Sequence, residues 1–231
     1  VNKISVNDNI AVISIIGQDL TNFHKPYTAL IRNKITPILL NNTVTGRNIS
    51  LVISQDEFKR ALNVIHGEIF GVAKKINIAI FGHGTVGGTL ISQILESAKN
   101  IETRIGVKLN VFAIANSKKV LLNKFGISEN WKATLEDKGQ EYNVEDIIAY
   151  AKEHHLENLI AIDNTASSTF IENYISLAEN SFDLISSNKV ANTVSFDFYK
   201  KLRKVLKDNQ KEYLYETNVG AGLPLIDTIK L

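Results

Sequence analysis

The fold is decided by the stretch Ile76-Asn77-Ile78-Ala79-Ile80-Phe81-Gly82-His83-Gly84-Thr85-Val86-Gly87-Gly88. Its first six residues predict a strand, and residues 86–99 continue as a helix. A Gly-x-Gly-x-x-Gly motif indicates dinucleotide binding when it joins such a strand to such a helix. Gly82 permits the tight turn, Gly84 lets a pyrophosphate approach the backbone, and Gly87 lets helix and strand pack closely. The phosphates are then expected at the helix N-terminus. The alternative is a glycine-rich turn in another kind of α/β protein.

The composition is that of a globular protein with one large or two ordinary domains. The chain has 231 residues, of which 44% are hydrophobic and 22% are charged. No apolar run approaches the roughly 18 residues that span a bilayer, and the first residues have no signal-peptide pattern. The absence of cysteine excludes disulfides, thiolate nucleophiles and Cys-ligated zinc. We therefore expect a cytoplasmic protein that binds no membrane.

Charge gives no support for a nucleic-acid partner. The net charge is +2 and the lysines are scattered along the chain. The basic run 200–207 has Leu202, Val205 and Leu206 at helical spacing, which favours a solvated helix face. The chain begins with Val1 and contains no methionine, so we expect either a portion of a longer polypeptide or a sequence from which methionine positions are missing.

Residues 1–71 predict a ferredoxin-like α+β module. The expected order is β-α-β-β-α, which is the beginning of that fold. The strands are expected at 10–16, 35–40 and 48–53, with a hairpin turn after the second, and the helices at 26–33 and 55–69.

Residues 75–231 predict a Rossmann-type, doubly wound parallel sheet. Strands and helices alternate along this module, as parallel sheets require. Strands are expected at 76–81, 109–115, 159–163, 182–186 and 212–216, and further helices at 144–154, 168–179 and 195–207. Ligands of such sheets bind beyond the carboxyl ends of the strands, so the residues after each strand are candidates for a site.

The second strand is followed by Asn116-Ser117-Lys118-Lys119, where an NAD-binding fold usually carries an acid. Serine and lysine can donate hydrogen bonds to a 2′-phosphate, so this segment favours NADP(H). An ordinary polar turn is the alternative.

Small polar groups and a lysine follow the next two strands. Thr165, Ala166 and Ser167 could line the nicotinamide ribose, or serve as a helix N-cap. Lys189 could bind a carboxylate or polarise a carbonyl group, although most lysines are simply solvated.

The fifth strand is followed by Glu216-Thr-Asn-Val219-Gly-Ala221-Gly-Leu223-Pro224. An acid followed by glycine-relaxed backbone can direct several oxygen atoms toward a hard cation. A tight turn closed by proline is the alternative. The five histidines have no metal-ligand spacing, and for His83 we expect the backbone to matter more than the ring.

Four segments together resemble homoserine dehydrogenase, in the form fused behind aspartate kinase. They are Phe-Gly-His-Gly-Thr-Val-Gly-Gly-Thr-Leu, Ala-Asn-Ser-Lys, Asn-Lys-Val-Ala-Asn-Thr and Tyr-Glu-Thr-Asn-Val-Gly-Ala-Gly-Leu-Pro. The last two are much more specific than the glycine motif. The resemblance covers residues 75–231, and residues 1–71 resemble the ACT regulatory domain of such fusions.

The resemblance implies NADPH-dependent reduction of L-aspartate 4-semialdehyde to L-homoserine, in threonine and methionine biosynthesis, by a homo-oligomer. It implies that Lys189 is catalytic and that a monovalent cation binds Glu216, Val219, Ala221 and Leu223. The cofactor-binding positions it implies are Gly82, His83, Gly84, Thr85, Val86, Gly87, Asn116, Ser117, Lys118, Thr165, Ala166, Ser167 and Lys189.

The chain departs from the family pattern in two places. It stops at Leu231, so the family's following catalytic domain is expected to be absent and the chain by itself to be inactive. Asn41-Asn42-Thr43 and Lys25-Pro26 stand where threonine-sensing relatives carry Gln-Gly and a glycine. The ACT-like module is therefore expected either to bind an amino-acid effector or to serve as a structural spacer or dimerisation domain. The alternative function is a non-catalytic, ACT-linked dinucleotide-binding module.

Overall fold

The computed structural model describes residues 8–16, 24–42, 48–70, 74–220, 222–223 and 225–230. The chain forms two compact units, Val1–Val72 and Ala73–Leu231. Each unit has its own hydrophobic core and is described by itself.

The first unit is a three-stranded antiparallel sheet with two helices. Its strand order is β1-β3-β2, and the β1–β3 ladder runs from Ile10↔Ser54 to Ile16↔Asn48. Its elements are β1 (Ile10–Ile16), α1 (His24–Arg32), β2 (Leu39–Asn42), β3 (Asn48–Ser54), the 3-10 helix η2 (Gln55–Glu57) and α2 (Phe58–Phe70). The predicted β-α-β-β-α order is present.

The core of this unit forms between one face of the sheet and both helices. Alternate residues of β1 and β3 are buried with Leu30 of α1 and Ala61 of α2, as the two-residue period of a strand requires. The second strand begins at Leu39 instead of the predicted residue 35, because Ile35 closes the end of α1 through a bond from its N–H to the carbonyl of Leu30. Residues 43–47 of the predicted hairpin turn lie outside the described residues.

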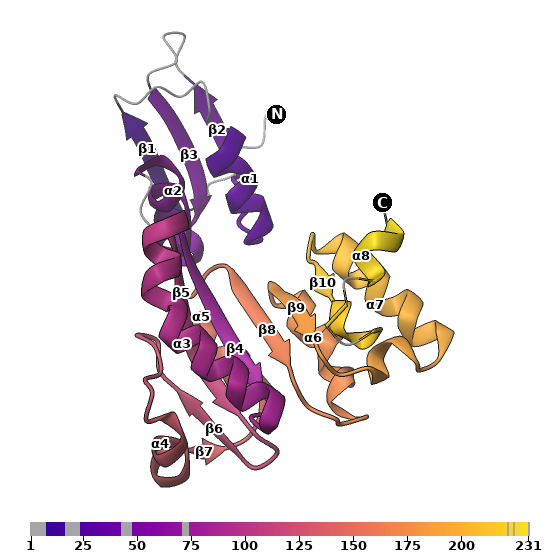
Figure 1. Ribbon diagram of the computed structural model, residues 1–231. Helices are drawn as coiled ribbons and strands as arrows, with labels where there is room; N and C mark the ends of the chain where they lie inside the picture. The colour runs from indigo at the N-terminus through magenta and orange to yellow at the C-terminus, as the bar shows by residue number, and fades with distance from the viewer. Residues whose placement is uncertain are drawn as a thin grey trace. The chain divides into compact units, whose positions relative to one another are not determined.

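The second unit is a seven-stranded sheet in the order β10-β9-β8-β4-β5-β6-β7 (Figure 1). Its elements are β4 (Lys74–Phe81), α3 (Thr85–Ile105), β5 (Val107–Ala115), β6 (Lys119–Leu122), α4 (Trp131–Lys138), β7 (Gln140–Glu141), α5 (Val144–Glu153), β8 (Leu159–Asp163), η3 (Phe170–Glu172), α6 (Asn173–Glu179), β9 (Phe182–Ser186), η4 (Val190–Asn192), α7 (Phe196–Asp208), β10 (Tyr213–Leu214), η5 (Glu216–Asn218) and α8 (Leu225–Lys230).

The sheet is mostly, but not entirely, parallel. The five strands from β10 to β5 are parallel, whereas β6 and β7 are antiparallel. The prediction of a parallel sheet was wrong at this edge because only residues 116–118 separate β5 from β6. A parallel neighbour needs a crossover of a dozen or more residues, so this short connection enforces an antiparallel pair.

Helices cover the two faces of the sheet separately (Figure 1). Ile91 of α3 and Trp131 of α4 pack on one face, together with Ile78, Ile80 and Ile114. On the other face Ile147 of α5, Leu177 of α6 and Leu202 of α7 pack against Phe81 and Phe112. This is the layered arrangement of doubly wound folds.

The strand order places a topological switch point between β4 and β8. From β4 the chain moves through α3 to β5 on one side, and it later returns to β8 on the other side. The connections after β4 and β8 therefore diverge above the carboxyl ends of these two strands, where ligands of open α/β sheets bind.

Candidate functional site

The glycine turn after β4 is fixed between β5 and β8. Gly82 has φ +82°, a conformation that side chains other than glycine's rarely adopt. Its N–H donates to the carbonyl of Ala115 at 2.9 Å, and a Cβ here would lie 3.0 Å from the carbonyl group of Asn164. The turn thus brings the backbone of three neighbouring strands together at the switch point.

The N-terminus of α3 has no side chain in front of it. Gly84 is the N-cap and makes no side-chain hydrogen bond, and a Cβ added there would meet no atom within 4 Å. The first N–H groups of a helix need partners, so this end offers donors to an anion. Gly87 lies on the inner side of the same turn, where a Cβ would collide with the carbonyl oxygen of Gly82.

His83 links the glycine turn to the segment after β5. Its Nε2 lies 3.1 Å from the Nδ2 of Asn116, and its ring packs edge-on against Trp131 at 5.2 Å. An amide N–H can only donate, so the Nε2 of His83 is the acceptor in this hydrogen bond. The ring therefore has contacts of its own, which the sequence did not indicate.

The polar segment after β5 divides into two parts. The Oδ1 of Asn116 accepts the N–H groups of Lys118 and Lys119 at 2.8 and 2.7 Å and so shapes the turn. The ammonium group of Lys119 donates to the carbonyl of Glu136 at 2.5 Å and pairs with its carboxylate at 3.3 Å. Ser117 and Lys118 are exposed, and Lys118 forms no side-chain ion pair within the described part of the chain. Lys118, rather than Lys119, is free to meet an anion.

A buried carboxylate organises the loops after β8 and β9. Asp163, 2% exposed, accepts hydrogen bonds from the N–H of Thr165 (2.7 Å), the hydroxyl of Tyr174 (2.6 Å) and the Nδ2 of Asn188 (3.0 Å). Three donors on one carboxylate compensate for its burial. The sequence indicated the loop but not this network.

The tyrosines near Asp163 stay protonated. Burial raises the pKa of Tyr174, and the negative charge of Asp163 raises it further. Burial, followed by the same charge, also raises the pKa of Tyr142. Tyr174 therefore remains a hydrogen-bond donor to Asp163 across the physiological pH range.

Asn188 forms hydrogen bonds that connect the segments after β8, β9 and β10. Its Nδ2 donates to the carbonyl of Ser167 at 2.9 Å as well as to Asp163, and its own carbonyl accepts the Nδ2 of Asn218 at 3.2 Å. The next residue, Lys189, is exposed. The backbone that carries Lys189 is thus fixed at the edge of the sheet while its ammonium group faces solvent.

Of the predicted residues after β8, Thr165 and Ser167 form hydrogen bonds within their own loop. The Oγ of Ser167 accepts the N–H groups of Thr169 and Phe170 at 3.3 and 3.1 Å, as in a helix cap. Thr165 accepts the N–H of Ser167 at 3.3 Å, and Ala166 is exposed. For Ser167 the structure thus favours the capping role that the sequence left open.

Asn164 lies at the site, although it was not among the predicted cofactor-binding positions. Its N–H donates to the carbonyl of Phe81 at 2.8 Å, and its Oδ1 accepts the hydroxyl of Ser187 at 3.1 Å. Its Nδ2 is buried and has no hydrogen-bond partner among the described residues. A buried amide donor beside the glycine turn calls for an acceptor. Its position directly after a strand was the available signal.

Of the four predicted cation ligands, Glu216 and Leu223 accept hydrogen bonds within the protein, while the other two are either exposed or outside the described residues. The two carboxylate oxygens of Glu216 accept the N–H groups of Ile226 (2.8 Å) and Asp227 (3.2 Å), at the start of α8. The carbonyl of Leu223 accepts the N–H of Leu225 at 2.8 Å. Val219 is exposed, and Ala221 is outside the described residues. No group of three or more His, Cys, Asp or Glu side chains suited to a metal occurs in the part that the structure describes.

A protein-family model matches residues 82–216, which is more than half of the chain and includes the segments that follow β4, β5, β8 and β9. The family is described as the homoserine dehydrogenase NAD-binding domain. This chain belongs to it. The resemblance expected from the sequence is therefore confirmed at the level of the family.

Curated relatives extend the similarity to the first unit. A bifunctional aspartokinase/homoserine dehydrogenase of Buchnera aphidicola is 34% identical over 99% of this chain, and one of Haemophilus influenzae is 31% identical over 98%. The chain spans only 29% and 28% of the length of these two relatives.

A solved structure shares the fold of the homoserine dehydrogenase NAD-binding domain. A hyperthermophilic archaeal homoserine dehydrogenase in complex with NADPH has a TM-score of 0.54 and 26% sequence identity. The match covers 67% of this chain and 48% of the archaeal chain. Among the helices of the described residues, none combines the length and the apolar composition that crossing a membrane would require.

Proposed function

We propose that this chain is the nucleotide-binding part of a bifunctional aspartokinase/homoserine dehydrogenase and that it holds NADP(H) for the reduction of L-aspartate 4-semialdehyde to L-homoserine. The observation that carries the proposal is the N-terminus of α3 at Gly84, which no side chain caps, together with the unpartnered Nδ2 of Asn164, a residue that lies beside Gly82 and Gly87. Residues 1–71 would be an ACT-like regulatory module and residues 75–231 the dehydrogenase module.

The residues at the switch point suit a dinucleotide. The free N–H groups at the start of α3 would bind the pyrophosphate, and the absence of a Cβ at Gly84 leaves space for it. Asn164 offers a buried amide donor that the protein itself leaves unused. When bound, NADPH would supply the hydride that reduces an aldehyde carbon.

Selectivity for NADP(H) would depend mainly on Lys118. Directly after β5, where an NAD-binding fold usually carries an acid that would repel a 2′-phosphate, this chain has Asn116 and Ser117. Lys118 and Ser117 are exposed on a turn that Asn116 holds in place, and either can donate to phosphate oxygens. Lys119 contributes less because Glu136 already holds its ammonium group.

Lys189 would act on the substrate. Its ammonium group can attract the carboxylate of aspartate semialdehyde, or stabilise the alkoxide as it forms. The bonds that Asn188 makes to Asp163 and Ser167 hold the backbone beside Lys189, so the base of this side chain has a defined position at the end of β9.

Two further parts of the proposal concern a cation and an effector. A monovalent cation at Glu216 would have to share the carboxylate with the N–H groups of α8, using lone pairs that these bonds leave free. The ACT-like module would bind an amino-acid effector or hold copies of the protein together in a homo-oligomer.

The proposal is tested by following NADPH absorbance in the gene's full-length product. Oxidation of NADPH that depends on L-aspartate 4-semialdehyde is expected, with NADPH preferred over NADH. A product that binds NADPH tightly but never oxidises it with this substrate would support the alternative, a non-catalytic nucleotide-binding module.

A further inference from the structure

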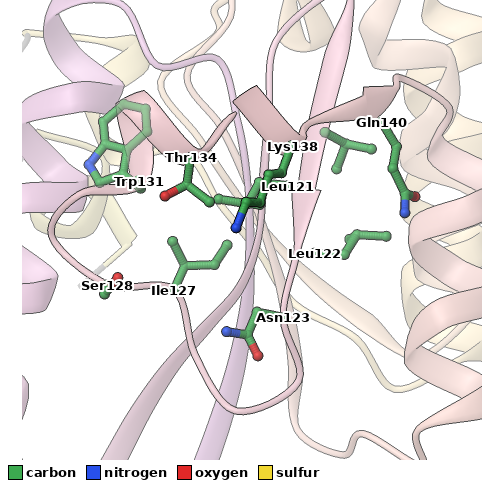
Figure 2. Close-up of a pocket in the computed structure, with 10 residues that line it drawn as sticks. Leu121, Leu122, Asn123, Ile127, Ser128, Trp131, Thr134, Lys138 and Gln140 are labelled. Atoms are coloured by element: carbon green, nitrogen blue, oxygen red, sulfur yellow. The ribbon is translucent and has the colours of Figure 1, made fainter. Parts of the chain in front are cut away.

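A cavity lies beside β6, among residues that are not proposed to hold the nucleotide (Figure 2). Its volume is about 280 Å³, close to the lower end of small-molecule pockets and suited to a compact ligand. It is lined by β6, the loop after it, α4 and β7, through Val120, Leu121, Leu122, Asn123, Ile127, Ser128, Trp131, Thr134, Lys138 and Gln140.

One part of the cavity wall is apolar and fixed in place. Ile127 is 6% exposed and Trp131 is 3% exposed, and both belong to the core beneath α3 and α4. Leu121 packs against the same core. These side chains cannot move away without disturbing the core, so the apolar wall is preformed.

Three of the polar side chains in the lining are already bound within the protein. Asn123 donates to the carbonyl of Gly126 at 2.8 Å and accepts the N–H of Phe125 at 3.0 Å. The hydroxyl groups of Ser128 and Thr134 both donate to Asn130, at 2.6 and 3.1 Å. The hydroxyl donors of Ser128 and Thr134 are therefore not available to a ligand, and one of the two amide hydrogens of Asn123 is already used.

Lys138 and Gln140 are the remaining polar side chains of the lining. Neither forms a side-chain hydrogen bond or ion pair within the described residues. In Figure 2 the side chain of Lys138 points toward the space between Thr134 and Ile127. No carboxylate lines the cavity, so the ammonium group of Lys138 is left without a counter-charge there.

We propose that this cavity binds a compact monocarboxylate whose hydrocarbon part packs on Leu121, Ile127 and Trp131 and whose carboxylate meets Lys138. A cation beside an apolar wall selects an anionic head group on an apolar body. The lining residues are not among those proposed to hold the nucleotide, although the ring of Trp131 contacts His83 of the glycine turn.

Trp131 provides a direct reporter because it is the one tryptophan in the sequence. We would label the 231-residue chain with ¹⁵N and follow its single indole N–H resonance during titration with sodium hexanoate. Hexylamine, which has a similar chain but the opposite charge, is the matched control ligand. A ligand of this size is expected to saturate the shift with a dissociation constant on the order of 1 mM.

Variants locate the binding. Lys138→Gln is expected to weaken hexanoate binding about tenfold, because it removes the charged partner of the carboxylate. Lys204→Gln removes an exposed lysine of α7, far from the lining in sequence, and should leave the titration unchanged. Both positions are exposed on helices, so both variants should fold.

Two results would overturn the proposal. The first is an indole resonance that does not move with hexanoate, or that moves equally with hexylamine. The second is a hexanoate titration that Lys138→Gln leaves unchanged, since binding would then lie elsewhere.

Discussion

Gly87 and Gly84 lie three residues apart, yet we expect alanine at these positions to damage different properties of the protein. Alanine at Gly87 would place its Cβ against the carbonyl oxygen of Gly82, and 3.3 Å from the Cβ of Asn164. Both are part of the fixed turn at the switch point, so α3 must move. Alanine at Gly84 would place its Cβ in open space, where the pyrophosphate is proposed to bind.

The size of each effect follows from these contacts. Overpacking against backbone lowers the free energy of unfolding by about 3 kcal/mol, and replacing glycine by alanine in a helix raises it by about 1 kcal/mol. The free energy of unfolding of Gly87→Ala should therefore be about 2 kcal/mol lower than that of the parent. For a domain of this size that corresponds to a fall in Tm of about 4–8 °C. Gly84→Ala should lower the free energy of unfolding by less than about 1 kcal/mol, because alanine is a poorer N-cap than glycine. The same variant should weaken NADPH binding at least tenfold, which corresponds to a loss of binding free energy on the order of 1.4 kcal/mol.

Thermal unfolding followed by circular dichroism, together with NADPH titration, separates the two effects. Gly67→Ala, in α2, is the control for helix propensity because its Cβ meets nothing within 4 Å, and it should not destabilise its unit. A Gly87→Ala variant as stable as the parent would refute the packing argument. Full NADPH affinity in a folded Gly84→Ala variant would refute the placement of the pyrophosphate.

Four further results are expected. Lys118→Gln should weaken NADPH binding about tenfold or more and leave NADH binding nearly unchanged. Lys119→Gln should have a smaller effect on NADPH binding, because Glu136 holds that side chain. Equal losses of affinity for both cofactors in calorimetric titration of Lys118→Gln would contradict the role given to Lys118. Lys189→Ala in the full-length product should lower kcat at least a hundredfold with little change in the Kd for NADPH, and steady-state kinetics with unaltered kcat would remove Lys189 from the mechanism. Burial raises the folded-state pKa of Tyr142, Tyr174 and Tyr213, so above pH ~10 these residues lose their protons more readily in the unfolded chain than in the folded one. The free energy of unfolding should therefore fall as the pH rises above this value. Ultraviolet titration should show these three tyrosines ionising only when the protein unfolds. Glu216→Gln should speed hydrogen exchange at the amides of Ile226 and Asp227, whereas unchanged exchange would mean that the carboxylate does not hold α8.

The sequence predicted the buried strands because parallel strands covered on both faces are continuous apolar runs. Residues 76–81, 159–163 and 182–186 all lie in strands of the central sheet. The edge was harder to predict, since β6 has four residues, β7 has two, and such short segments carry no periodicity. The fifth strand was predicted at 212–216, but β10 ends at Leu214, so Glu216 lies in a 3-10 turn.

The site was predicted as a set of loops but not as a network. The residues that follow each strand were identified because parallel strands end at one edge of the sheet. Their contacts depend on partners distant in sequence. Asp163 meets Tyr174, eleven residues later, and Asn188, twenty-five residues later. Lys119 was grouped with Lys118 on charge alone, and only the position of α4 assigns it to Glu136.

Fluorescence titration of the purified 231-residue chain with NADPH, and in parallel with NADH, examines the proposed nucleotide site without requiring turnover. Saturable NADPH binding is expected, at least tenfold tighter than NADH binding, because a charge-assisted bond to the 2′-phosphate distinguishes the two. Lys118→Gln should lose the preference for NADPH over NADH. Gly84→Ala should lose the binding of both nucleotides. A folded chain that binds neither nucleotide would contradict the assignment of the switch point as an NADP(H) site.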